Sequence, residues 1–221
     1  MTQKYAVIFD MDGVLVNSSP FHMEAWELFS AKYKCPINYA AFYNTFGMRN
    51  DEILPLLFPN RFKPEEFSRV DEEKEALYRQ CIRGKVQPPE GLIEFMEALQ
   101  EANIAMAIGS SGPRLNVELI INELHLNKYL KGFVCGGDVK KAKPHPDIFL
   151  KAAKKCNLDP QNCLVIEDAP LGVDAAIAAG MTSIGYLSTA TPEALHKANH
   201  LISSFNEAHV QLVTKIIQEN I

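Results

Sequence analysis

The chain has 221 residues, of which 47% are hydrophobic and 22% are charged, so it can bury a sizeable core in one or two domains. Its 22 basic and 27 acidic side chains give a net charge of −5 without a basic cluster, which argues against a nucleic-acid partner. The N-terminus has no signal-peptide pattern, and no apolar run approaches the roughly 18 residues of a membrane helix. We therefore expect a soluble cytoplasmic protein with no membrane partner, and a monomer.

The cysteines are odd in number and widely spaced, and no two of them form a CxxC pair. This pattern indicates neither a disulfide framework nor a zinc site. We expect free, mostly buried thiols in a reducing compartment. The five positions are Cys35, Cys81, Cys135, Cys156 and Cys163.

The first predicted element is a strand that starts at Tyr5 and runs into Asp10, Asp12 and Gly13. A run that is apolar at every position is typical of a strand buried on both faces, as in a parallel sheet. Gly13 lets the chain turn sharply at the carboxyl end of this strand, where open α/β sheets bind their ligands. Asp10 and Asp12 then need a cation, a shared proton or a wide solvent gap between them. A solvated acidic turn is the alternative.

Residues 16–87 contain no convincing strand and read as a helical block. We expect this block to be an inserted helical cap domain that covers the strand ends, while residues 1–15 and 88–221 form the core domain. Hinges are expected near residues 16–18 and 87–89, where both connections pass. The predicted cap helices are Pro20–Tyr33, Tyr39–Phe46, Asp51–Phe58 and Pro64–Arg83.

After Gly91 the pattern alternates between helices and short apolar strands. This alternation predicts an α/β fold: a Rossmann-like parallel sheet with helices on both faces. The predicted strands are Ile104–Gly109, Gly132–Gly136, Cys163–Glu167, Thr182–Leu187 and His200–Ile202. The predicted helices are Leu92–Ala102, Pro113–Leu124, Pro146–Cys156, Leu171–Ala179, Thr191–Ala198 and Asn206–Gln218.

Polar groups follow four of the predicted strands, and the carboxyl ends of parallel strands meet at one edge of a sheet. Carboxylate oxygens favour Mg²⁺, whereas helix N-terminal amides with an ammonium suit a phosphate. A carboxylate beside bound Mg²⁺ can attack phosphorus. The sequence therefore predicts Mg²⁺-dependent phosphate chemistry, with no ATP phosphate loop and no dinucleotide fingerprint. The groups are Asp10 and Asp12, Ser110 and Ser111, Lys143, and Glu167 with Asp168.

These residues also carry a family resemblance, because four ordered motifs span nearly the whole chain. Asp10 opens a DxDGV motif, Ser110 ends the second strand, Lys143 opens KPxPD and Glu167 opens EDxxxGVxAA. With these motifs the sequence resembles the haloacid dehalogenase superfamily, in the branch of β-phosphoglucomutases and sugar-phosphate phosphatases. The resemblance implies that the ligand is a small phosphorylated metabolite.

The resemblance implies a role for each motif residue. Asp10 is implied to be the nucleophile that forms an aspartyl-phosphate, and Asp12 the general acid and then the base. Ser110 is implied to hold a phosphate oxygen, and Lys143 to neutralise the phosphate and steady Asp10. The implied Mg²⁺ site consists of Asp10, the backbone carbonyl of Asp12, Asp168 and the nearby Glu167.

Substrate choice is assigned to the cap by the same resemblance. His22, Arg49 and Lys74 stand at matching positions and together favour a phosphorylated sugar or polyol. Each has another interpretation: His22 as an inert helix residue, Arg49 as a surface residue and Lys74 as part of a solvated charged run. The predicted substrate-binding residues are His22, Gly47, Arg49, Asn50, Lys74, Ser111 and Arg114.

The sequence departs from the mutase pattern at two places. Asn17 stands where many relatives have an aspartate, and Pro113 and Arg114 occupy the region where mutases grip a second phosphate. A Mg²⁺-dependent phosphatase is therefore the first hypothesis and a β-phosphoglucomutase the second. A haloacid dehalogenase is disfavoured by Asp12, and a non-enzymatic binding module by the complete set of motifs.

Overall fold

The computed structural model describes residues 3–42, 45 and 48–220. Its strands are β1 Ala6–Phe9, β2 Ala105–Gly109, β3 Phe133–Val134, β4 Cys163–Glu167, β5 Thr182–Tyr186 and β6 His200–Ile202. Its helices are α1 Ser19–Tyr33, α2 Tyr39–Phe42, α3 Asn50–Leu57, α4 Phe67–Ile82, α5 Leu92–Glu101, α6 Arg114–Glu123, α7 Asp147–Lys155, α8 Pro170–Ala178 and α9 Val210–Gln218. Short 3₁₀ turns are Pro64–Glu66, Leu126–Lys128, Gly136–Asp138, Pro160–Asn162 and Phe205–Glu207.

The six strands form one parallel sheet in the order β3-β2-β1-β4-β5-β6. The central strand β1 pairs on both sides, with Ile8 opposite Ala107 of β2 and Val165 of β4. The order reverses next to β1, and open α/β sheets bind ligands at such a switch point. The predicted parallel α/β core is confirmed.

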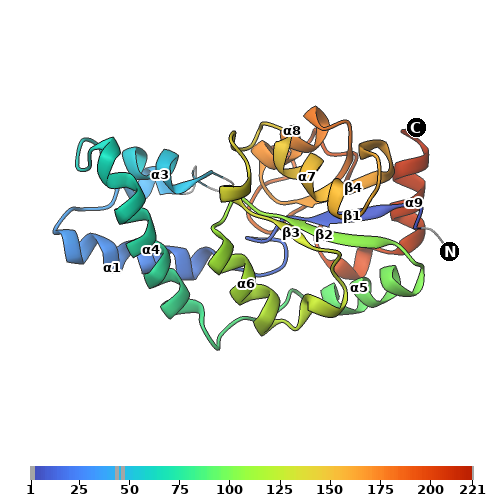
Figure 1. Cartoon of the computed structure of the whole chain (residues 1–221), viewed down its shortest axis with the longest axis horizontal. Helices are drawn as coiled ribbons and strands as arrows, with labels where there is room; N and C mark the ends of the chain where they lie inside the picture. Colours follow the sequence, from blue (N-terminus) through green and yellow to red (C-terminus); the bar gives the residue numbers. More distant parts are fainter. Residues whose placement is uncertain (1–2, 43–44, 46–47, 221) are drawn as a thin grey trace.

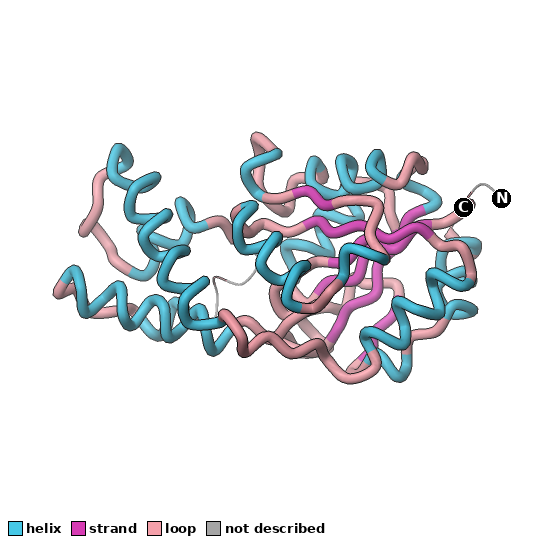
Figure 2. Tube along the Cα trace, turned by 60° about the horizontal axis from the view of Figure 1, so that its bottom comes forward, coloured by secondary structure: helices cyan, strands magenta, loops and turns pink. Residues whose placement is uncertain are grey.

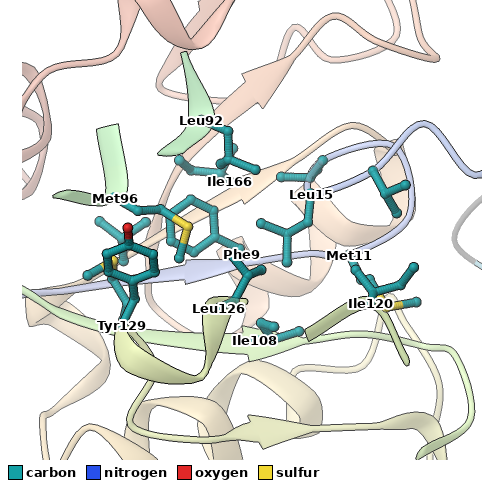
Figure 3. Packing of buried hydrophobic residues seen from close by; sticks show 14 of the residues in the cluster. Phe9, Met11, Leu15, Leu92, Met96, Ile108, Ile120, Leu126, Tyr129 and Ile166 are labelled. Atoms are coloured by element: carbon teal, nitrogen blue, oxygen red, sulfur yellow. The ribbon is translucent and has the colours of Figure 1, made fainter. Parts of the chain in front are cut away.

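Alternate residues of β1 face opposite sides of the sheet, as the pleat requires. Val7 and Phe9 join a cluster with α5, α6 and α9, whereas Ala6 and Ile8 join a second cluster with α7 and α8. Figure 3 shows Phe9 packed among side chains of the first cluster, near Met96. The sheet is thus the middle of three layers, which explains why its strands are apolar at every position.

The helices α1 to α4 form a region of their own at the end of the molecule away from both termini (Figure 1). This helical region, Ser19–Ile82, buries a separate cluster around Trp26, Phe29 and Phe58. Figure 2 shows helices and loops but no strand in the traced part of this region. The segment predicted as a helix over residues 39–46 is helical over Tyr39–Phe42, and residues 43, 44 and 46 lie outside the described part. The domain boundaries at residues 15/16 and 87/88 stay a prediction.

Two of the sequence predictions about helices are wrong. Residues 191–198 form turns rather than a helix, because Leu195 is the one fully buried apolar side chain there and the chain must return at once to β6. The segment 206–218 is interrupted: His209 is extended, and its Nδ1 accepts a hydrogen bond from the backbone N–H of Leu212 (3.1 Å), so α9 begins only at Val210. The predicted strand 132–136 is shorter than expected, covering Phe133–Val134.

All five cysteines are free and buried, as the sequence predicted. Within the described ranges no helix is both long and apolar enough to cross a membrane.

Candidate active site

A cavity of about 680 Å³ opens at the carboxyl edge of the sheet and extends to the helical region. Its walls include Asp10, Asp12 and Asp168 from the strand ends, and Trp26 and Ile53 from the helices. Pockets of this size accommodate small organic ligands, and this one lies at the switch point of the sheet. The cavity is therefore the candidate active site.

Lys143 forms ion pairs with the carboxylates of Asp10 and Glu167 at the bottom of the site. Its Nζ donates to Asp10 Oδ1 at 2.7 Å and to Glu167 Oε1 at 2.5 Å, and the lysine is 4% exposed. Burial disfavours the ammonium, but Asp10 and Glu167 more than offset this and raise the pKa of Lys143. The loop before α7 thus places the predicted Lys143 as a cation against the end of β1.

Asp168 and Glu167 each approach the backbone so closely that one position beside each of them requires glycine. A Cβ on Gly13, whose φ is +81°, would lie 1.9 Å from Asp168 Oδ2, and a Cβ on Gly172 would lie 1.8 Å from Glu167 Oε1. Glu167 also accepts the backbone N–H of Asp168 at 2.8 Å. The two glycines of the motifs therefore make room for the two carboxylates.

Asp10, Glu167 and Asp168 form an acidic cluster, with one carboxylate oxygen of each within 4.8 Å of the others. Burial, followed by the charges of Glu167 and Asp12, raises the pKa of Asp10 to about 7 despite the opposing effect of Lys143. Burial, followed by the charges of Glu167 and Asp10, also raises the pKa of Asp168. Three buried carboxylates on one lysine leave negative charge in excess. This all-oxygen set fits a hard divalent cation, which would relieve the repulsion.

Asp12 lies on the cavity side of the same turn and faces the helical region. His22 Nε2 lies 3.4 Å from Asp12 Oδ1, and the His22 ring stacks on Tyr78 with centroids 3.9 Å apart. Burial alone would raise the pKa of Asp12, but hydrogen bonds from His22 and Ser18 hold it below its ordinary value. The two aspartates of the first motif therefore have opposite electrostatic environments.

The loop after β2 packs against this turn. Ser110 is 1% exposed, and its Oγ accepts the backbone N–H of Gly112 at 3.0 Å. A Cβ added to Gly112 would lie 3.2 Å from Ser110 Oγ and 3.7 Å from Asp12 Oδ2. Ser111 lines the cavity. Both predicted serines thus lie at the sheet edge, next to the turn that carries Asp12.

Lys74 is almost completely buried, at 1% exposed, unlike the lysine of a solvated charged run. Its Nζ lies 2.7 Å from His22 Nδ1 and 2.7 Å from Glu75 Oε1, and 4.7 Å from the Trp26 ring centre. Burial opposes ionisation of Glu75, but Lys74 and the other donors lower its pKa to about 2. Lys74 therefore contacts the ring nitrogen of His22 that points away from Asp12, and its charge is paired with Glu75.

Glu75 connects the helical region to the core. Asn50 Nδ2 donates to Glu75 Oε1 at 2.5 Å and to Asp71 Oδ1 at 2.6 Å. Asn116 of α6 donates to Glu75 Oε2, and Arg79 donates to Asn116 Oδ1 at 2.9 Å. The predicted Asn50 thus lies in a polar network on the cavity wall.

The two predicted arginines lie on the cavity wall and are each paired with a carboxylate. Arg49 Nε lies 3.5 Å from Asp51 Oδ1. One terminal nitrogen of Arg114 donates to Asp138 Oδ1 and Oδ2 at 2.9 and 3.1 Å, and its guanidinium lies over the Phe133 ring. The predicted Gly47 lies outside the described residues.

Several residues at the site were missed by the sequence analysis. Thr189 donates to Asp168 Oδ2 through its hydroxyl, and Ser188 does so at 3.3 Å. Both follow β5, so the rule that located the other strand ends could have found them. Glu75, Asp71 and Asn116 had no such signal, because their roles depend on how α4 packs against α6.

Comparisons with known proteins agree with this geometry. A family model described as haloacid dehalogenase-like hydrolase matches residues 5–180. A phosphorylated carbohydrates phosphatase of Thermotoga maritima is 33% identical over 183 residues, covering 81% of this chain and 83% of that protein. A fructose-1-phosphate phosphatase of Escherichia coli is 29% identical over 185 residues, covering 83% and 97%.

Solved structures give the same result. A β-phosphoglucomutase of Clostridium difficile aligns with a TM-score of 0.85 and 29% identity, covering 97% of both chains. A hydrolase of the same superfamily from Entamoeba histolytica aligns with a TM-score of 0.88 and 30% identity, covering 97% of this chain and 99% of that one. From its motifs, its fold and these matches, the chain belongs to the haloacid dehalogenase-like hydrolases and is a phosphohydrolase enzyme of that family.

Proposed function

We propose that this protein is a Mg²⁺-dependent phosphatase that hydrolyses small phosphate monoesters, in particular sugar phosphates, through an aspartyl-phosphate on Asp10. The observation that carries the proposal is the buried cluster of Asp10, Glu167 and Asp168 against Lys143 at the bottom of a ligand-sized cavity. Related proteins named as sugar-phosphate phosphatases support the substrate class.

In the proposed first step, a carboxylate oxygen of Asp10 attacks the phosphorus of the ester. The bond from phosphorus to the leaving oxygen breaks, and Asp12 gives that oxygen a proton. In the second step, water attacks the same phosphorus and gives its proton to Asp12. Inorganic phosphate leaves and the Asp10 carboxylate is restored. Asp10 must be ionised to attack, whereas burial and its acidic neighbours raise its pKa, so a cation that offsets these charges would favour the reactive form.

The remaining residues hold the reacting groups. Lys143 fixes one oxygen of Asp10 at 2.7 Å, so the other oxygen is left to act. Asp10, Asp168, Glu167 and the Asp12 carbonyl would hold Mg²⁺, which when bound would offset the repulsion between the carboxylates and the incoming phosphate. Ser110 would bind a phosphate oxygen, and His22 orients Asp12.

A β-phosphoglucomutase is the second candidate, because proteins with that name are 28% and 29% identical to this chain. The two reactions differ in what attacks the aspartyl-phosphate: water, or a hydroxyl of the sugar. In the proposed mechanism Arg114 does not grip a second phosphate, since Asp138 already occupies its guanidinium.

Release of phosphate tests the proposal. Sugar, polyol and nucleotide monophosphates would be incubated with Mg²⁺, beside β-glucose 1-phosphate with a trace of the 1,6-bisphosphate. We expect phosphate release from a few related sugar or polyol phosphates. Conversion to glucose 6-phosphate with almost no free phosphate would identify a mutase instead, and full activity with a chelator present would contradict the metal requirement.

A further inference from the structure

The cations that line the cavity are outnumbered by carboxylates. Among the described lining residues, seven are acidic: Asp10, Asp12, Asp51, Asp71, Glu75, Asp138 and Asp168. Three are lysine or arginine: Arg49, Lys74 and Arg114. Lys143 does not line the cavity wall and is held between Asp10 and Glu167, where in the proposed mechanism it acts at the transferred phosphate. The part of the substrate that extends toward the helical region therefore meets these three cations and their neighbours.

Each of the three cations already has a carboxylate partner of its own. Lys74 pairs with Glu75 at 2.7 Å, and both side chains are at most 3% exposed. Arg114 pairs with Asp138 at 2.9 Å, and Arg49 lies 3.5 Å from Asp51. A second anionic group on a substrate would have to displace a partner carboxylate to gain a cation. Such an exchange gains little, because the displaced carboxylate is left unpaired.

Asp71 adds a carboxylate with no ion-pair partner among the described residues. Its Oδ1 accepts from Asn50 Nδ2 at 2.6 Å. Asp71 lies on the cavity wall between Asn50 and Glu75, and it is only partly exposed. A carboxylate that is half removed from water repels a nearby anion more strongly than a surface carboxylate does. Among the described residues no hydrogen bond reaches its second oxygen, which can accept from a substrate hydroxyl.

We propose that the cavity selects phosphate monoesters whose leaving group is uncharged and rich in hydroxyls, that it rejects molecules with a second anionic group, and that Asp71 is the residue chiefly responsible. This inference rests on the proposed phosphatase function and narrows its substrate class. Asn50 is anchored to Glu75 and holds Asp71 in place, so the Asp71 carboxylate and the Asn50 carbonyl form one hydrogen-bonding wall for hydroxyls. A bisphosphate would bring its second phosphate to this wall and be disfavoured.

A matched pair of substrates tests the charge alone. Glycerol 3-phosphate and 3-phosphoglycerate have the same chain length but differ in a hydroxymethyl against a carboxylate at the far end. The wild-type protein should prefer glycerol 3-phosphate by about tenfold in kcat/KM, since one repelled charge at close range is worth about that much. The preference should lie in KM rather than in kcat, because the far end takes no part in the chemistry.

Asp71→Asn keeps the acceptor for Asn50 and removes the charge, so it should reduce the preference at least about threefold by lowering KM for 3-phosphoglycerate. Asp51→Asn should also reduce the preference, because it leaves Arg49 free to bind the substrate carboxylate. We expect the fold to tolerate this change, since the Asp51 side chain is 55% exposed. The control is Glu72→Gln on the same helix, a 65% exposed glutamate outside the cavity wall, which should leave the ratio unchanged.

The outcomes separate the inference from the function on which it rests. Equal kcat/KM for the two substrates, or a ratio that neither Asp71→Asn nor Asp51→Asn changes, overturns the inference while phosphate release continues. If the wild-type protein releases no phosphate from either substrate or from p-nitrophenyl phosphate with Mg²⁺ present, the proposed function fails first and the inference with it.

Discussion

Two buried lysines form ion pairs with carboxylates in this protein, and the pKa of the partner carboxylate is shifted in opposite directions. Lys143, at the sheet edge, faces Asp10 and Glu167, with Asp168 close behind, and the pKa of Asp10 is raised to about 7. Lys74, in the helical region, has Glu75 as its ion-pair partner, and the pKa of Glu75 is lowered to about 2. The first group has an excess of negative charge, whereas the second is balanced.

The difference follows from the hydrogen-bond donors around each carboxylate. Glu75 accepts from Lys74, Asn50 and Asn116, so its ionised form is fully satisfied. Asp10 accepts from Lys143 but lies beside other buried carboxylates. A balanced group stabilises a structure, whereas an unbalanced one has a strong affinity for a cation or an electrophile. The group at the sheet edge therefore favours binding of a cation or an electrophile, whereas the group in the helical region favours a fixed structure.

The largest expected effect is the loss of reaction at the unbalanced group. Asp10→Asn removes the proposed nucleophile, so phosphate release should fall by at least about a thousandfold. The same change removes one charge from a crowded cluster, so the melting temperature should hold or rise. Asp174→Asn, which changes a surface aspartate paired with Lys197, should leave both quantities unchanged. Residual turnover above about a hundredth would make the nucleophile assignment wrong.

The second-largest expected effect is the loss of turnover when the Lys143 ammonium is removed. Lys143→Met leaves Asp10 and Glu167 without their shared donor, so Asp10 loses its orientation and turnover should fall on the order of a hundredfold. Phosphate release with saturating Mg²⁺ measures this loss. Lys141→Met, two residues away and exposed, is the control. A loss confined to KM with normal kcat would mean that Lys143 binds substrate without steadying Asp10.

Breaking the balanced ion pair of Lys74 and Glu75 should lower the free energy of unfolding. Glu75→Ala leaves the Lys74 ammonium buried without a carboxylate, which typically costs about 3 kcal/mol of the free energy of unfolding. Urea denaturation measures this value, and Glu72→Ala on the same helix should change it by less than about 0.5 kcal/mol. A cost below about 1 kcal/mol would show that Lys74 finds another partner and that the network is not tightly closed.

The sequence predicted the sheet edge far better than the helical region, for a physical reason. Asp10 and Ser110 each follow an apolar strand and Glu167 ends one, and the rule that parallel strand ends meet is enough to bring them together. Gly13 and Gly172 mark where the backbone must make room for carboxylates. These signals are local in sequence, so they can be read without a structure.

The helical region follows no comparable rule. Lys74 lies in a run of charged residues that indicates a solvated face, yet it is buried against His22 and Trp26. Its environment depends on how α4 packs on α1 and α6, which no local pattern encodes. The same holds for Glu75 and Asn116, which are 41 residues apart in sequence. The roles predicted for His22, Arg49 and Asn50 stay predictions.

The smallest expected effect is the response of stability to Mg²⁺. A cation that binds the cluster of Asp10, Glu167 and Asp168 relieves repulsion in the folded state only, so millimolar Mg²⁺ should raise the melting temperature by a few degrees. Asp168→Asn removes one of the repelling charges, so it should raise the melting temperature of the metal-free protein. It should also abolish the further rise on addition of Mg²⁺. Differential scanning fluorimetry measures both, with NaCl at matched ionic strength as the control.

The same response should depend on pH in a defined direction. Because the pKa of Asp10 is raised to about 7 in the folded protein, a bound proton stabilises the metal-free fold at low pH and that stability is lost as pH rises toward 7. Mg²⁺ takes over the role of the proton, so its increment should be larger at about pH 8 than at about pH 5.5. An equal increment at both values, or an increment that survives in Asp168→Asn, would place the cation away from the sheet edge and remove the contrast between the two lysine groups.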